Sequence, residues 1–307
     1  MSDAIHNEHK SRLFSFIFGR EENKRWALSL YNAVNGTDYS NPDEVEITTM
    51  DDTIYMGMKN DLSFIVRCDL NLYEHQSTYN PNMPVRQLMY VGRLYDKYIK
   101  RTNQNIYGTK RLILPIPRLM TFYNGLSEQS DQILRLSDSF PNVSCSDESD
   151  IEVKVHMVNI RPHCNNHILN ECKILSEYSW FIEEIRKNNG TMELEEAVDR
   201  AIKEMPQEYE LKALLVAHAS EVRNMLITEY NETETMQLFK QEGREEGRTE
   251  LLIRQICRKL QKGKNATVIA DELEEDEPRI KAICDSLVRF APEYDEDAVV
   301  KGVHSLN

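Results

Sequence analysis

Two short strand-like segments, close together in the chain, constrain the fold more than any other feature of the sequence. Residues 61–66 and 69–76 have the apolar content and alternation of β-strands, and only two residues separate them. A two-residue loop joins antiparallel strands and fixes which residues face each other across the hairpin. Each residue of one strand then pairs with the residue of the other strand that is equally far from the loop. The hairpin therefore predicts that Asp61 lies opposite Glu74.

An acidic pair in this position needs a compensating charge. Like charges that face each other across two strands destabilise a sheet, so the carboxylates of Asp61 and Glu74 need a cation or a shared proton. Mg²⁺ binds through one or two carboxylates, water and substrate phosphate, and it lowers the pKa of a bound water that attacks a phosphodiester. Gln76 follows on the same face of the strand. The alternative is that Asp61 belongs to a turn and Glu74 is an exposed strand residue.

The N-terminal half mixes helices with strands. Helical spacing of apolar residues predicts helices from Lys10 to Phe18, from Glu21 to Val34 and from Met83 to about Arg101. Further strands are expected near 45–47, 118–123 and 151–160.

The remainder of the chain has helical patterns throughout, near 167–187, 192–204, 209–229, 232–261, 266–273 and 277–290. We expect an α/β (α+β) core followed by an all-helical C-terminal region. The expected domains are 1–165, a helical extension over 166–248 and a small helical module over 249–307.

Basic residues gather beside the acidic pair. The chain carries a net charge of −14, so any nucleic acid must be contacted locally rather than by bulk attraction. Four cations at helical spacing, opposite a stripe that contains Leu88, form the predicted DNA-binding face: Arg86, Arg93, Lys97 and Lys100. The alternative is an ordinary solvated helix surface.

The segment from 54 to 86 adds a family resemblance. It reads IYMGMKNDLSFIVRCDLNLYEHQSTYNPNMPVR. It resembles the recombination-promoting nuclease (Rpn) and putative transposase family of the PD-(D/E)XK nuclease superfamily. The segments that carry the resemblance are Asn60-Asp61, residues 72–78 (LYEHQST), residues 80–84 (NPNMP), residues 30–37 (LYNAVNGT), Pro117-Arg118, residues 122–125 (FYNG) and residues 243–247 (GREEG).

The resemblance implies a restriction-endonuclease-like core that cuts double-stranded DNA, with Mg²⁺, or Mn²⁺ or Ca²⁺ in its place, on Asp61 and Glu74. Gln76 takes the position of the superfamily's lysine. It is a neutral amide that can orient water but supplies no charge. Lys59, opposite Gln76 in the same register, is the candidate for a migrated lysine.

The first helix shows a second departure from the family. Relatives often carry an acidic residue after the lysine that matches Lys10, and this chain has Ser11. Glu21 or Glu22 could substitute for it, although acidic residues at the head of a helix usually interact with the helix dipole.

Other features indicate the cellular setting. The six cysteines are scattered, as in proteins with reduced thiols, residues 1–12 lack the apolar stretch of a secretory signal, and no apolar run approaches about 18 residues. We expect a cytoplasmic protein without a membrane partner. Whether it forms a homo-oligomer stays open.

Three functions remain open from the sequence. The leading prediction is a metal-dependent DNA endonuclease, linked by the resemblance to DNA recombination or transposition. The second is a catalytically inactive nuclease-like scaffold that binds protein or DNA. The third is a transcriptional regulator that binds a duplex through residues 250–300.

Overall fold

The computed structural model describes residues 12–49, 61–140, 149–164, 167–288 and 291, and within 231–246 only the backbone is described in most positions. Lys10, Ser11 and Lys59 therefore lie outside the described residues. Contacts between residues divide the chain into two compact units, Met1–Glu232 and Thr233–Asn307. Each unit is described by itself below.

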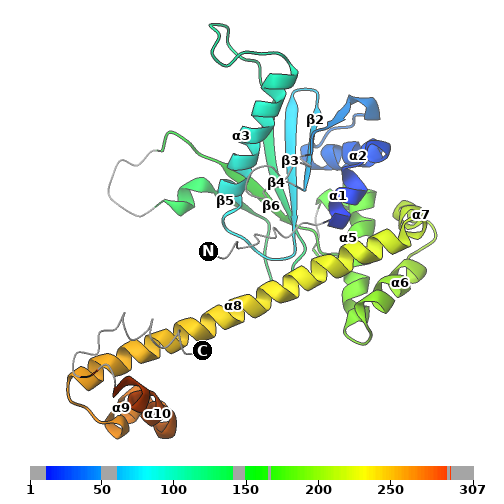
Figure 1. The fold of residues 1–307 in the computed structure, drawn as a ribbon. Helices are drawn as coiled ribbons and strands as arrows, with labels where there is room; N and C mark the ends of the chain where they lie inside the picture. Colours follow the sequence, from blue (N-terminus) through cyan, green and yellow to red (C-terminus); the bar gives the residue numbers. More distant parts are fainter. Residues whose placement is uncertain (1–11, 50–60, 141–148, 165–166, 289–290, 292–307) are drawn as a thin grey trace. The chain divides into compact units, whose positions relative to one another are not determined.

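The first unit contains a six-stranded mixed sheet with the strand order β1-β2-β3-β4-β6-β5. The central strands β3, β4 and β6 are parallel, and the remaining neighbours are antiparallel. The strands are β1 (Val45–Ile47), β2 (Leu62–Val66), β3 (Asp69–Gln76), β4 (Ile116–Tyr123), β5 (Gln132–Arg135) and β6 (Lys154–Asn159). The N-terminal part of the chain thus has a mixed α/β fold (Figure 1). The short strand β5 was missing from the sequence prediction.

The β2–β3 hairpin has the predicted register. Val66 pairs with Asp69, and the ladder continues outward to Leu62 opposite Tyr73. The two-residue turn begins at Arg67, which adopts a positive φ of 55°. This backbone conformation is unfavourable for a side chain other than glycine, and it is the local strain that the tight connection requires.

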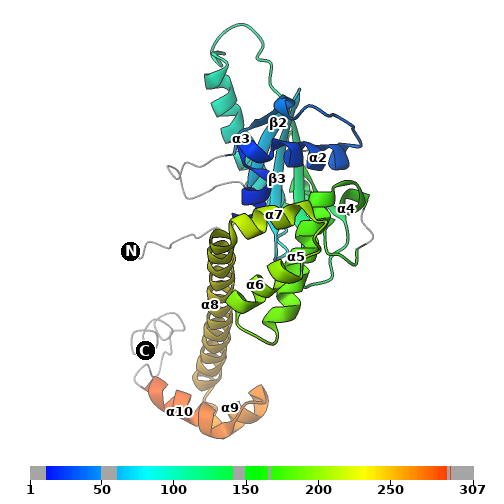
Figure 2. The same ribbon diagram turned by 90° about the vertical axis from the view of Figure 1, so that its right-hand side faces the viewer.

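Helices cover both faces of the sheet (Figures 1 and 2). Helix α3 (Met83–Arg101) connects β3 to the parallel strand β4 and packs on one face. The opposite face is covered by α1 (Arg12–Phe18), α2 (Lys24–Asn35) and α5 (Lys173–Asn189). Helix α2 ends at Gly36, whose φ of 64° closes the helix in the left-handed conformation that glycine adopts readily.

The core behind β3 and β4 is aromatic. Phe122 on β4 lies with its ring centroid 5.5 Å from that of Tyr73 on β3 and 5.7 Å from that of Phe14 on α1. Phe14 also contacts Tyr178 on α5, at a centroid distance of 5.8 Å. One cluster of rings therefore joins two strands and two helices.

The other helices of the first unit follow β6. They are α4 (His167–Glu171), α6 (Leu194–Glu204) and α7 (Glu210–Ala217), and short 3-10 turns occupy Glu21–Asn23, Pro42–Glu44 and Leu136–Ser139. Helix α8 (Ala219–Gln261) continues into the second unit. The predicted break near 230 is wrong: the interruption lies at His218, and no glycine or proline stands near 230 to end a helix.

The second unit packs the end of α8 with α9 (Ala266–Leu273) and α10 (Glu277–Leu287) around a small apolar cluster. Asn265 caps α9, because its side chain accepts a hydrogen bond from the Val268 N–H at 3.0 Å. Hydrogen bonds from Lys259 and Lys264 lower the pKa of Glu272 to about 2.

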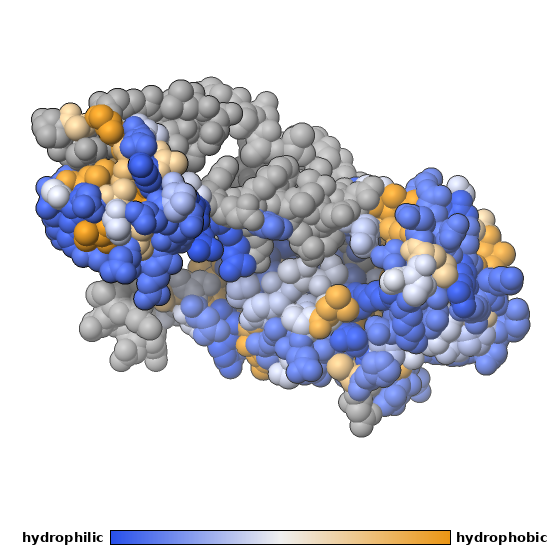
Figure 3. Space-filling view, turned by 90° about the horizontal axis from the view of Figure 1, so that it is seen from below, coloured by the Kyte–Doolittle hydropathy of each residue, from blue (hydrophilic) through white to orange (hydrophobic). Residues whose placement is uncertain are grey.

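On the face drawn in Figure 3, hydrophilic residues predominate and the hydrophobic ones form small, separate groups. In the part of the chain that the structure describes, no helix combines the length and the apolar character needed to span a bilayer.

Candidate active site

Asp61 and Glu74 hold each other in place at one end of the hairpin. The Asp61 N–H donates a hydrogen bond to Glu74 Oε1 at 3.2 Å, and the N–H of His75 donates to Asp61 Oδ2 at 2.8 Å. Both acidic residues are buried, with exposed fractions of 3% and 2%. Asp61 lies just before β2, so these side-chain bonds extend the pairing beyond the strand. The structure thus brings the two predicted carboxylates together.

Among the ion pairs that the structure describes, Glu74 pairs with Arg86. Its Nη2 lies 3.9 Å from Glu74 Oε2, and the same nitrogen donates a hydrogen bond to the Tyr90 hydroxyl at 3.1 Å. Both residues belong to the first half of α3, which begins soon after β3 ends. The guanidinium group therefore lies at the edge of the acidic pair.

The donor atoms of the pair suit a hard divalent cation. Both residues offer carboxylate oxygens, which are preferred ligands of Mg²⁺, Mn²⁺ and Ca²⁺. Among the described residues, no group of three or more His, Cys, Asp or Glu side chains could hold a metal.

Gln76 lies two residues after Glu74 on β3, but its side chain is directed elsewhere. Its Nε2 lies 2.8 Å from the sulfur of Met83, the first residue of α3. The Gln76 side chain thus contacts the start of α3, and among the described residues no hydrogen bond joins it to the two carboxylates. The prediction for Lys59 lies outside the described residues.

Three polar residues that the sequence did not single out lie on the elements around the pair. The Ser15 hydroxyl on α1 donates to the carbonyl oxygen of Asp61 at 2.7 Å. Thr121 on β4 is fully buried and pairs in register with Glu74. Gln87 on α3 is also fully buried, and its Nε2 donates to the carbonyl oxygen of Met120 at 3.0 Å. The sequence feature that could have singled out Gln87 is a polar amide among the apolar residues of a predicted helix.

Comparisons of the chain with protein-family models, with curated proteins and with solved structures found no match. The family resemblance stays a prediction. Any structural support for a function therefore comes from the arrangement of the residues in this site.

The four predicted cations lie at helical spacing along the single helix α3. Arg86 and Arg93 are half-buried, whereas Lys97 and Lys100 are exposed. The predicted apolar stripe is wrong for Leu88, which is 36% exposed. The buried stripe instead contains Met83, Gln87, Tyr90, Val91 and Leu94, because α3 packs these residues on β3 and β4. Arg86 and Arg93 therefore lie at the edge of the surface through which α3 packs on the sheet.

His75 points to the opposite face of the sheet. Its ring stacks on Phe14 at a centroid distance of 5.5 Å, and its Nε2 lies 3.1 Å from the Tyr178 hydroxyl. Burial, and to a smaller extent the positive charge of Arg186, lowers the pKa of His75 to about 3. The imidazole is therefore neutral at physiological pH and anchors α5 behind the carboxylate pair.

This buried histidine predicts a dependence of stability on pH. In the unfolded chain His75 has its ordinary pKa of 6.5, so the unfolded state binds the proton more readily. The stability that His75 contributes is complete above about pH 6.5 and falls as the pH decreases toward 3. Between pH 7 and pH 5 the loss is about 2 kcal/mol. Urea unfolding of the wild type and of His75→Gln at both pH values measures it: the variant should lose less stability than the wild type.

The matched control is His156→Gln, because His156 is exposed on β6. It should show the same pH dependence as the wild type. Equal losses in His75→Gln and in the wild type would contradict the assignment.

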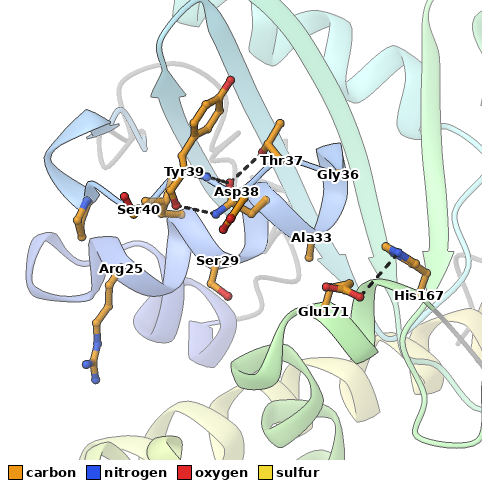
Figure 4. A pocket seen from close by; sticks show the side chains of 13 residues that line it. Arg25, Ser29, Ala33, Gly36, Thr37, Asp38, Tyr39, Ser40, His167 and Glu171 are labelled. Atoms are coloured by element: carbon orange, nitrogen blue, oxygen red, sulfur yellow. Dashed lines mark hydrogen bonds and ion pairs between the residues drawn. The ribbon is translucent and has the colours of Figure 1, made fainter.

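A hollow of about 540 Å³ lies at the end of α2, away from the acidic pair. Figure 4 shows that α2, the loop after it and α4 form its walls. Asn32 shapes the loop, because its Oδ1 accepts hydrogen bonds from the Thr37 hydroxyl at 2.9 Å and from the Tyr39 N–H at 3.1 Å. Side chains of both signs, Arg25 and Glu171 among them, line the hollow, so its charge favours no particular class of ligand.

Proposed function

We propose that this protein is a metal-dependent DNA endonuclease that hydrolyses phosphodiester bonds. The observation that carries the proposal is the carboxylate pair Asp61 and Glu74, interlocked by backbone hydrogen bonds and bordered by Arg86. The proposal includes membership of the Rpn family of PD-(D/E)XK nucleases, a cytoplasmic location and a role in DNA recombination or transposition.

Asp61 and Glu74 would hold Mg²⁺, or Mn²⁺ or Ca²⁺ in its place, through carboxylate oxygens. A bound divalent ion polarises the phosphodiester and lowers the pKa of a water molecule. Hydrolysis would form a bond between a water oxygen and phosphorus while one P–O ester bond breaks, and the leaving oxygen would take up a proton. Gln76 would position water through its amide only after its Nε2 has left the Met83 sulfur, which it contacts in this structure.

Arg86 would bind the phosphate group beside the reacting bond. Its guanidinium lies at the edge of the acidic pair and can form paired hydrogen bonds with phosphate oxygens. Arg93, Lys97 and Lys100 would contact the DNA backbone farther along α3. With a net charge of −14 in the whole chain, these contacts must be local.

Cleavage of supercoiled plasmid DNA tests this function. The wild type should nick or linearise the plasmid with Mg²⁺ or Mn²⁺ and should be inactive in EDTA. Asp61→Ala should be inactive with either metal, because one of the two carboxylates is missing. Asp138→Ala, which removes an exposed acid from the turn after β5, is the control and should cleave like the wild type. Wild-type protein that cleaves with no metal would contradict the proposal.

A second prediction concerns the phosphate contact. Arg86→Ala should weaken binding to duplex DNA of any sequence and reduce the slope of log affinity against log salt by about one, because one phosphate contact is lost. Fluorescence anisotropy at several salt concentrations measures both quantities. The control is Lys110→Ala, an exposed cation in the loop after α3, which should keep the wild-type slope. An unchanged slope in Arg86→Ala would contradict the contact.

A non-catalytic scaffold is the second candidate. It is favoured by the burial of both carboxylates and by the contact of Gln76 with Met83. A scaffold predicts that the wild type cleaves no plasmid with any metal, so the same assay separates the two functions. The third candidate, a regulator, predicts duplex binding that depends on the basic residues of α10 and its neighbours instead of those of α3.

A further inference from the structure

A groove of about 570 Å³ lies beside the second half of α3, on the sheet face that carries the acidic pair. Ile65 on β2 and Leu70 on β3 are register partners and line the groove together with Leu94 of α3. Tyr98 and Pro115 add a ring and a flat apolar surface. The volume falls within the ordinary range for small-ligand sites. The apolar lining suits a flat, weakly polar group.

Cations border the same groove. Lys97, Lys100 and Arg101 all contribute to its lining. Lys100 pairs with Asp96 at 2.7 Å, and Arg101 pairs with Glu46. Lys97 is exposed and makes no ion pair within the described ranges of the chain. The groove thus combines an apolar lining with a positive rim, and an anionic ligand would meet Lys97 without displacing an acid.

The position of the groove relates it to the proposed cleavage site. Arg86, beside Glu74, precedes Lys97 by eleven residues of one helix, a distance of about 16 Å along the helix axis. At about 3.4 Å per nucleotide in one strand of B-form DNA, this corresponds to about five nucleotides. A DNA strand that starts at the carboxylates and follows α3 would therefore reach the groove.

We propose that this groove binds an unstacked nucleotide of a single-stranded DNA segment next to the cleavage site. The inference rests on the proposed function. The bases of an intact duplex are stacked inside the helix, whereas an unpaired base can enter an apolar groove and pack on an aromatic ring. Its phosphate group would lie against Lys97. The substrate class is therefore duplex DNA that carries a single-stranded end or gap.

Binding in EDTA tests the groove without any cleavage. Fluorescence anisotropy compares a blunt duplex with the same duplex carrying an overhang longer than about five nucleotides. The wild type should bind the overhang duplex at least about fivefold more tightly, because stacking on an aromatic ring adds affinity for each base. In Lys97→Glu the ratio of the two affinities should fall to about one. In Lys110→Glu, a matched charge reversal outside the groove, the ratio should stay as in the wild type.

Equal affinities of the wild type for the two duplexes would overturn the inference, as would a ratio that survives in Lys97→Glu. Competition with free deoxynucleoside monophosphates shows whether the groove binds a nucleotide within a DNA strand or a free nucleotide. Tight binding of the free nucleotide together with equal affinities for both duplexes would overturn the assignment to DNA. Loss of plasmid cleavage is a separate result that concerns the carboxylates, so the two failures can be told apart.

Discussion

Glu74→Gln is expected to reduce metal-dependent cleavage of plasmid DNA by more than about a hundredfold, because loss of an outer-shell partner of a metal alone costs up to that factor. The substitution keeps the shape of the side chain and an oxygen that can accept the hydrogen bond from the Asp61 N–H. It removes only the negative charge that attracts the cation. Initial rates of nicking at several Mg²⁺ concentrations measure the effect, and higher metal concentrations should restore part of the activity.

Stability separates this loss from misfolding. Because Glu74→Gln also removes the repulsion between two buried acids, its midpoint of thermal unfolding in EDTA should be no lower than that of the wild type. The matched control is Glu128→Gln, since Glu128 is exposed in the connection between β4 and β5. It should cleave at the wild-type rate. A Glu74→Gln protein that cleaves as fast as the wild type would rule out Glu74 as a metal ligand.

Phe122→Ala is expected to lower the free energy of unfolding of the first unit by about 3–5 kcal/mol. The Phe122 ring is fully buried between Tyr73 and Phe14, so its removal leaves a cavity where two strands and α1 meet. For a unit of this size the thermal midpoint should fall by about 10 °C. Differential scanning calorimetry of the full chain measures the shift in the transition of the first unit.

Leu126→Ala is the control for this substitution. Leu126 is 73% exposed four residues farther along the chain, so its truncation should change the midpoint very little. A shift of equal size in both variants would contradict the view that the ring cluster stabilises the core behind the carboxylates.

The contact between Asp61 and Glu74 could be predicted because a hairpin is a local structure. Two residues between two strands fix the register, and the pairing of Val66 with Asp69 follows from the sequence alone. The period of two along a strand then places Glu74 and Gln76 on one face. The helix predicted to end at Val34 likewise ends one residue later, at Asn35.

The partners of the pair from other strands could not be predicted in this way. Strand β4 lies parallel to β3 after a long connection through α3, and no local pattern in the sequence specifies which strand becomes its neighbour. The register between Glu74 and Thr121, and the bond from Gln87 to the Met120 carbonyl, depend on that placement.

The face of α3 that packs on the sheet is a second feature that could not be predicted from the sequence. Apolar spacing favoured a stripe through Leu88, but Tyr90 and Leu94 contact the sheet and Leu88 is exposed. A helix with apolar residues on much of its circumference can bury more than one stripe, and packing decides between them. Arg86 consequently lies at the edge of the contact with β3, next to Glu74.

Direct measurement of metal binding tests the central claim, that Asp61 and Glu74 together hold a divalent ion. Electron paramagnetic resonance follows the free Mn²⁺ during titration of the DNA-free protein, the Asp61→Asn variant and the Glu74→Gln variant. The wild type should bind a single Mn²⁺ per chain, and each variant should bind it at least about tenfold more weakly. Equal binding by all three proteins, or no binding by the wild type, would contradict the claim.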